Sequence, residues 1–205
     1  FLPAWQCPGC YASGFISIAP AGGAGPCTAE YPFSCTGISG YSGGGKKMIA
    51  EIESPDRAPE LYSPRFYGLA NNHKHLPEMQ KISGLEKKPM FTPIVDDYYN
   101  GMVVCVPIQA AVSGFSLEPE RVQEMLERHY EAPTRPCTAA ETPAEMTATK
   151  LSCNDLRDTN QMEIFVFGDA EQILLCSRLD NLGKGASGAA VQCMNIMLEI
   201  DEPVT

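Results

Sequence analysis

The chain has 205 residues, with 15 Lys and Arg against 25 Asp and Glu and a formal net charge of −10. This length suits one domain with its own core, so we treat residues 1–205 as a single domain. The acidic balance argues against binding to nucleic acid or to an anionic membrane surface. The apolar runs are far shorter than the roughly 20 residues of a transmembrane helix, so no membrane association is expected. Nine cysteines in mostly apolar context differ from a secreted disulfide framework and favour a cytoplasmic protein.

The first predicted elements surround a glycine-rich turn. A strand-like run leads into this turn, and a helix-like run follows it. A second strand comes next, followed by a short helix that has Pro77 in its first turn. In chain order these predicted elements are a strand at 33–38, the turn at 39–45, a helix at 46–52, a strand at 65–70 and a helix at 76–81.

The later predicted elements are two hairpins, two amphipathic helices and a polar surface segment. They are a hairpin of 90–95 with 102–108, a helix at 118–130, the surface segment 134–158, a hairpin of 162–167 with 173–179, and a helix at 187–200. Hairpins and separated helices without strict βαβ alternation predict an α+β fold. We expect a mixed, largely antiparallel sheet with helices on one face.

Cys10 is the best candidate for a nucleophile. It follows Pro8 and Gly9 at the expected start of a helix, where the helix dipole would lower the thiol pKa from about 8.5 toward neutrality. A buried structural cysteine is the competing interpretation in a chain with nine of them. Cys7 and Cys10 also form a Cys-x-x-Cys pair, which leaves a thiol–disulfide function open.

His73 and His75 are the candidates for general acid and base, because the ordinary pKa of a histidine, about 6.5, is close to working pH. Metal binding is the alternative for a His-x-His pair. The cysteines offer no second close pair that would complete a zinc site, so we expect no metal. His129 lies on the predicted amphipathic helix, and we expect it at the surface or at the edge of the core.

Two glycine-rich stretches, 37–45 and 183–188, are candidates for anion binding through backbone N–H groups. Lys46, Lys47 or Lys184 would add positive charge there. Tight turns are the simpler interpretation, and neither stretch matches a complete dinucleotide-binding fingerprint or a Walker loop.

Four segments, taken together and in order, resemble one enzyme family. They are Pro8-Gly9-Cys10-Tyr11, Ser39 to Lys46, His73 to Met79, and Asp180 to Asn195. This combination resembles the shorter bacterial type of N-acetyl-gamma-glutamyl-phosphate reductase, from about Cys7 to the C-terminus. The resemblance implies a fold like the C-terminal domain of glyceraldehyde-3-phosphate dehydrogenase. It also implies that Cys10 attacks a small-molecule acyl phosphate and that the resulting thioester is reduced with NADP(H) in arginine biosynthesis.

The resemblance also implies the remaining site residues. Either His75, slightly favoured, or His73 would assist the thiol. Substrate and cofactor would be bound by Ser39, Gly40, Tyr41, Ser42, Gly43, Glu78, Asn181, Lys184, Gly185, Ala186 and Ser187.

The family architecture sets the domain expectations. An N-terminal Rossmann-type domain of the family is absent from these residues, and the helix within 181–200 would pack on it. A homodimer or homotetramer is implied. Cys7 stands where the family usually has Asn, and it could pair with Cys10 in a disulfide. Two alternatives to the reductase remain: a non-catalytic domain without its nucleotide-binding partner, or a Cys-x-x-Cys thiol–disulfide protein.

Overall fold

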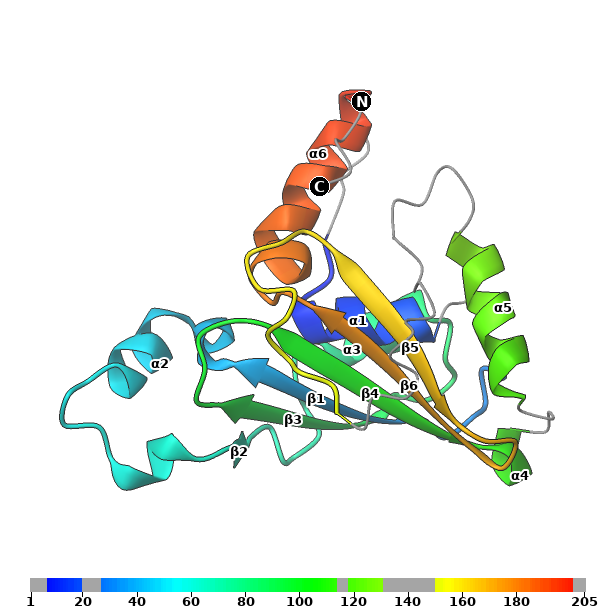
Figure 1. Cartoon of the computed structure of the whole chain (residues 1–205), viewed down its shortest axis with the longest axis horizontal. Coiled ribbons are helices and arrows are strands. Elements are labelled where there is room, and N and C mark those ends of the chain that lie inside the picture. Colours follow the sequence, from blue (N-terminus) through cyan, green and yellow to red (C-terminus); the bar gives the residue numbers. More distant parts are fainter. Residues whose placement is uncertain (1–6, 20–26, 114–117, 131–149, 201–205) are drawn as a thin grey trace.

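A six-stranded mixed sheet forms the centre of the molecule (Figure 1). The structure is a computed structural model and describes residues 7–19, 27–113, 118–130 and 150–200. In these residues the strand order is β2-β3-β1-β4-β6-β5. The strands are β1 (Ser34–Gly40), β2 (Arg65–Phe66), β3 (Met90–Asp96), β4 (Met102–Gln109), β5 (Met162–Gly168) and β6 (Gln172–Leu179). All pairs are antiparallel except β1 with β3, which are parallel.

The helices and helical turns of the described residues precede, connect and follow these strands. They are α1 (Cys10–Ile18), η1 (Tyr41–Gly44), α2 (Gly45–Ile52), η2 (Pro59–Tyr62), α3 (Leu76–Ile82), α4 (Ala110–Ser113), α5 (Pro119–Tyr130), the π-helical turn η4 (Gly183–Ser187) and α6 (Gly188–Met197). None of them combines the length and the hydropathy needed to span a bilayer.

The main core lies between one face of the sheet and helices α1, α3 and α5. Alternate side chains of the strands point to this face, as the period of two in a strand requires. The core includes Phe15, Ile18, Met79, Val122, Leu126, Met102, Val104, Val106, Ile164, Leu175 and Leu179. The α+β fold with helices on one face is therefore confirmed.

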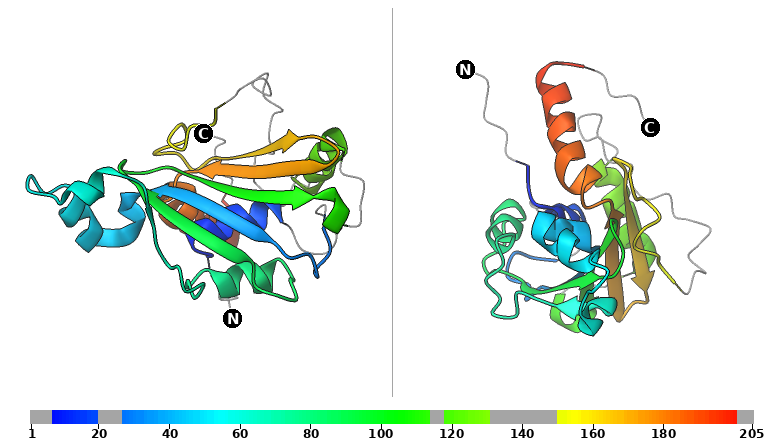
Figure 2. Two further views of the ribbon diagram at one scale, coloured as in Figure 1. Left: turned by 90° about the horizontal axis from the view of Figure 1, so that it is seen from below. Right: turned by 90° about the vertical axis from the view of Figure 1, so that its left-hand side faces the viewer.

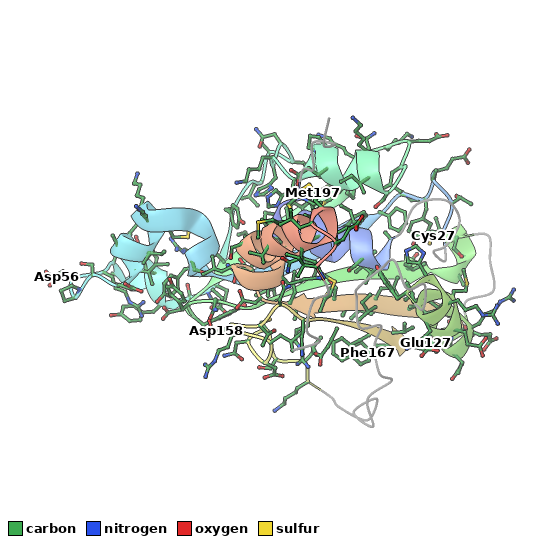
Figure 3. All side chains as sticks on the ribbon, turned by 90° about the horizontal axis from the view of Figure 1, so that it is seen from above. Cys27, Asp56, Glu127, Asp158, Phe167 and Met197 are labelled. Atoms are coloured by element: carbon green, nitrogen blue, oxygen red, sulfur yellow. The ribbon has the colours of Figure 1, made fainter. Side chains whose placement is uncertain are left out.

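The opposite face of the sheet carries a second, smaller cluster around Val103, Phe165 and Cys176. Phe167 packs against it, on the side of the sheet away from α1 and α3 (Figure 3). Arg178 makes salt bridges with Asp155 and Glu163 on this side. The segment from residue 150 to 158 is thereby held against the hairpin of β5 and β6.

Several predicted elements are confirmed. The strand, glycine-rich turn and helix appear as β1, η1 and α2; the second hairpin is β5 with β6; and the amphipathic helix is α5. The predicted strand at 65–70 is shorter, since β2 covers only Arg65–Phe66. Most of the predicted surface segment 134–158 lies outside the described residues.

The predicted hairpin of 90–95 with 102–108 is wrong in its pairing. Both strands exist, but β1 lies between β3 and β4 and pairs with each of them. The end of β1 and the start of η1 occupy the turn between β3 and β4. There the amides of Gly40, Tyr41 and Ser42 donate to the carbonyls of Gly101, Tyr98 and Tyr99. The β3–β4 turn therefore accepts hydrogen bonds from the end of β1 and the start of η1.

The C-terminal helix differs from its predicted form. Residues 183–187 form a π-helical turn, and the α-helix begins at Gly188 and ends at Met197. No residue of α6 is buried, and the helix projects from the body of the domain (Figure 2). Val191, Met194 and Ile196 are exposed apolar side chains along it, and exposed Leu198 follows its last residue.

Candidate active site

Cys10 is the first residue of α1. Gly9 precedes it in an extended conformation, with φ −69° and ψ 161°, and its carbonyl accepts the first helical hydrogen bond, from Ser13 N–H, at 2.8 Å. Tyr11 and Phe15 anchor the helix in the core. The predicted place of Cys10 at a helix start is confirmed, and the thiol sits at the positive end of the helix dipole.

His75 and Glu78 lie against the turn that precedes Cys10. The backbone N–H of Gly9 donates to Oε2 of Glu78 at 2.9 Å. A Cβ built on Gly9 would stand 1.9 Å from Nε2 of His75, so the imidazole occupies the space that a side chain would fill. Both residues come from the 73–78 segment, which therefore meets the turn before Cys10 directly.

The two predicted histidines form one aromatic cluster with Tyr11. Their ring centroids are 4.6 Å apart, and the Tyr11 ring lies 6.0 Å from His73 and 5.9 Å from His75. The backbone N–H of His75 donates to Nδ1 of His73 at 3.2 Å. Nδ1 of His75 is buried and has no hydrogen-bond partner among the described residues.

Burial sets the protonation states of His75 and of Cys10. It lowers the pKa of His75 from 6.5 to about 4, with the positive charges of His73 and Lys74 adding to the effect. Burial also raises the pKa of the Cys10 thiol from 9.0 to about 11, although the Tyr11 backbone N–H and Lys74 act in the opposite direction. The expectation of a lowered thiol pKa is therefore wrong in this structure, because desolvation of the thiolate exceeds the stabilisation by the helix terminus. The resting pair is a neutral thiol and a neutral imidazole.

The glycine-rich turn contributes two polar side chains to the interior. Ser39 Oγ lies 2.7 Å from the Tyr11 hydroxyl, which also donates to the Ile94 carbonyl at 3.1 Å. Ser42 Oγ accepts from Nδ2 of Asn181 at 2.9 Å. Ser39 thus supports the tyrosine beneath the histidines, and Ser42 joins the glycine-rich turn to the segment after β6.

Asp180 and Asn181 hold that segment in place. Asp180 is fully buried, and its two carboxylate oxygens accept from the N–H groups of Leu182, Gly183 and Asp158 and from Nδ2 of Asn100, at 2.6 to 2.7 Å. Asn181 Oδ1 accepts from Gly101 N–H at 2.8 Å. This dyad connects η4 with the β3–β4 turn, the 150–158 segment and the glycine-rich turn.

Gly185 brings η4 against the candidate nucleophile. Its N–H donates to the Asp180 carbonyl at 2.8 Å, and a Cβ at this position would lie only 2.6 Å from Cβ of Cys10. Cys10 is therefore in close contact with Gly185. The Gly9 turn that precedes Cys10 contacts His75 and Glu78.

The family profile described as "Semialdehyde dehydrogenase, dimerisation domain" matches residues 10–181. The chain belongs to this family. The N-acetyl-gamma-glutamyl-phosphate reductases of Rhizobium leguminosarum bv. trifolii and Brucella abortus are each 40% identical to it, over 93% of this chain and 63% of the relative. The resemblance inferred from the motifs is confirmed, and the chain spans 63% of the length of these relatives.

Solved structures agree on the fold. Aspartate semialdehyde dehydrogenase II from Vibrio cholerae matches with a TM-score of 0.64 at 18% identity, covering 94% of this chain and 61% of that one. A probable aspartate-semialdehyde dehydrogenase from Pseudomonas aeruginosa matches with a TM-score of 0.59 at 17% identity, with the same coverage. This chain therefore shares its fold with the matched 61% of each of those chains.

Some of the predicted site residues of this semialdehyde dehydrogenase domain face elsewhere. Tyr41 directs its hydroxyl to Glu53 at 3.2 Å and stacks edge-on with Tyr99. Lys184 is buried, and its ammonium donates to Gln192 Oε1 at 2.7 Å. These two side chains brace local structure.

The remaining predicted residues either pack their backbone closely against a neighbouring segment or are exposed. Gly40 passes so close to the β3–β4 turn that a Cβ would meet the Tyr99 carbonyl at 2.4 Å. Gly43 is exposed beside Asn181, and Ala186 and Ser187 are exposed in η4. Lys46 and Lys47 are exposed on α2.

Four residues that sequence reasoning did not place in the site are important to it. Gly9 makes room for His75, Tyr11 supports both histidines, and Asp180 with Asn100 anchors η4. Gly9 and Tyr11 flank Cys10 in the sequence, and Asp180 precedes Asn181, so their positions next to predicted site residues could have pointed to them. Asn100 has no signal in the sequence, since its role arises from a contact across 80 positions. In the described residues, no group of three or more metal-binding side chains is present.

Proposed function

We propose that this domain provides the catalytic part of an NADP-dependent N-acetyl-gamma-glutamyl-phosphate reductase. The observation that carries this proposal is the placement of Cys10 at the start of α1, with Gly185 in close contact and the preceding Gly9 turn against His75 and Glu78. The 40% identity to reductases of that name supports the choice of substrate.

The neutral pair suits a nucleophile that is activated only when substrate arrives. A neutral His75 can accept a proton, and Cys10 keeps its proton until the acyl phosphate is in place. The sulfur then attacks the acyl carbon, the C–O bond to phosphate breaks, and a thioester forms on Cys10. After the thioester is reduced, the C–S bond breaks as the electron pair of the oxygen forms the aldehyde C=O. Protonated His75 then returns its proton to the leaving Cys10 sulfur, which restores the neutral thiol and the neutral imidazole.

The residues around η4 fit a nicotinamide cofactor. The backbone of Gly185 lies against Cys10, and Ala186 and Ser187 are accessible beside it. When bound, NADPH supplies the hydride that reduces the thioester. The residues that would hold its nicotinamide end are Asn181, Gly185, Ala186 and Ser187, while Ser42 and Gly43 border the same segment.

The exposed helix α6 belongs to the same proposal. We place the rest of the cofactor on a separate nucleotide-binding part of the protein, which would cover the apolar side chains of α6. The family description, a dimerisation domain, supports a homo-oligomer, for which we propose a homodimer or homotetramer. The eight described cysteines are all free thiols, which is consistent with a cytoplasmic location.

The direct test is acylation of Cys10. The chain is incubated with N-acetylglutamate, ATP and N-acetylglutamate kinase, which make the acyl phosphate in place, and is analysed by mass spectrometry at acid pH. We expect an N-acetylglutamyl adduct on the peptide that contains Cys10. Cys10→Ser should not form this thioester, and Cys7→Ser is the matched control that keeps it.

The two alternatives give different results. A non-catalytic domain forms no adduct on either cysteine, and a thiol–disulfide protein forms a Cys7–Cys10 bridge without acylation. In the protein that includes the nucleotide-binding part, phosphate-dependent NADP⁺ reduction with N-acetylglutamate semialdehyde should require Cys10. Loss of activity in Cys10→Ser, with wild-type folding, is the expected outcome.

A further inference from the structure

Two cysteines that the proposed chemistry does not use meet beside the middle of α6. Cys7 Sγ lies 3.7 Å from Cys193 Sγ, although the residues are 186 positions apart. Cys7 belongs to the segment that leads to Cys10, and Cys193 lies near the middle of α6. The thiol contact therefore joins the turn before the candidate nucleophile to the projecting helix.

The surroundings permit these sulfurs to come closer. A disulfide needs an S–S distance of about 2.0 Å, so one side must shift by less than 2 Å. Both cysteines are only half-buried, and no residue of α6 is buried. In this 205-residue chain, movement of the helix toward Cys7 would disrupt little packing, and a small-molecule reagent can reach both thiols.

A second close thiol pair lacks these properties. Cys105 and Cys176 have sulfurs 3.3 Å apart, but they face each other across paired strands β4 and β6, and Cys176 is buried. The strand register also limits how far either backbone can adjust.

We propose that Cys7 and Cys193 form a reversible disulfide by exchange with a low-molecular-weight disulfide such as oxidised glutathione. One protein thiolate attacks the reagent, and the reagent's S–S bond breaks with release of one small thiol. The second protein thiolate then attacks the protein sulfur of the mixed disulfide and displaces the second small thiol. Two protein thiols lose two electrons and two protons in total, and the reagent gains them as two thiols.

This bond would tie the segment before Cys10 to α6. The covalent bond between the two sulfurs would restrain the relative movement of these two segments. If the proposed function holds, the oxidised form would also restrain η4, which begins the C-terminal segment and contacts Cys10. The disulfide itself does not depend on that function.

The experiment uses the full 205-residue chain in glutathione buffers of graded redox ratio, followed by acid quenching, alkylation and mass spectrometry. Alkylatable thiols should fall from nine to seven as the buffer becomes oxidising, with an intact mass lower by two hydrogen atoms. Peptide mapping should find Cys7 linked to Cys193. Excess reduced glutathione should restore all nine thiols, and amide exchange in α6 should be slower in the oxidised chain.

Two substitutions provide matched controls. Cys193→Ser should abolish the two-hydrogen loss and leave a glutathione adduct on Cys7, whereas Cys153→Ser, another half-buried cysteine, should keep the bridge. Cys10→Ser should also keep the bridge. A Cys7–Cys10 link, a Cys105–Cys176 link or retention of all nine thiols in wild-type chain would each overturn the proposal. Because these readouts need no substrate, they are independent of whether Cys10 becomes acylated.

Discussion

The imidazole of His75 fills the space where Gly9 has no side chain. A Cβ on Gly9 would stand 1.9 Å from Nε2 and 2.4 Å from Cδ2 of that ring. The same glycine donates its N–H to Glu78, so the backbone one residue before Cys10 contacts two predicted site residues at once. The position of the candidate acid–base group relative to the candidate nucleophile therefore depends on the absence of one methyl group.

Gly9→Ala should displace the His75 ring. We expect a loss of about 1–3 kcal/mol in the free energy of unfolding, since overpacking a filled site has costs of this order. Urea unfolding of wild type, Gly9→Ala, His75→Ala and the double variant measures it. In the double variant the added methyl has room, so the cost of Gly9→Ala should fall by about 1 kcal/mol or more. If the losses in free energy of unfolding of the two single variants simply add in the double variant, the contact between Gly9 and His75 is contradicted.

Asp180→Asn should destabilise the domain more than Asp158→Asn, the same change at a residue whose N–H bonds to Asp180. The buried carboxylate accepts four hydrogen bonds, and an amide would turn an NH₂ group toward some of those donors. We expect a loss of about 2–4 kcal/mol, as for a buried charged hydrogen-bonding group left unmatched. Thermal and urea unfolding give the values.

Asp158→Asn is the matched control for that change. Asp158 is exposed, accepts one side-chain hydrogen bond from Asn100 and has φ 63°, a conformation that Asn tolerates. Its substitution should alter stability by less than about 1 kcal/mol. Equal losses for the two variants would argue against the anchoring role of Asp180.

The fold was predictable where local pattern decides it. Apolar spacing was sufficient for α5, and two strand-like runs around a turn were sufficient for the hairpin of β5 and β6. The separation of β3 from β4 by β1 was not predictable in the same way. Insertion of β1 depends on hydrogen bonds from Gly40 to Gly101 and from Ser42 to Tyr99, across more than 50 positions.

In the candidate site, too, features set by local sequence were predictable and features set by long-range contacts were not. The helix start at Cys10 follows from its own sequence, and the motif brings His75 and Gly185 into the list of candidates. The protonation of Cys10 was predicted with the wrong sign, because it depends on burial that only the fold creates. The anchoring of η4 by Asn100 was missed for the same reason.

His75 should make stability depend on pH between about 4 and 6.5. In this window the unfolded chain protonates the imidazole while the folded chain keeps it neutral, so the free energy of unfolding falls as pH decreases. The contribution of this residue is at most about 3 kcal/mol, and solvent screening reduces it. Urea unfolding of wild type and His75→Gln at several pH values isolates the His75 contribution to the free energy of unfolding. The carboxylates titrate alike in the two proteins, so their contributions cancel. The variant should have a shallower slope, and identical slopes would argue against a neutral buried His75.

The Cys10 thiol should alkylate slowly at neutral pH. Because its pKa is raised to about 11, the folded chain at pH 7.5 should hold roughly a hundredfold less Cys10 thiolate than the unfolded chain, whose thiol has the ordinary value of 9.0. The measurement is the rate of iodoacetamide modification of the Cys10 peptide from pH 6 to 11, by mass spectrometry, with chain unfolded in urea as reference. In the folded chain the rate should continue to rise beyond pH 9, whereas the reference should level off near it. A plateau of the folded rate below pH 8 would mean that the helix terminus outweighs burial, and that Cys10 is activated before any substrate binds.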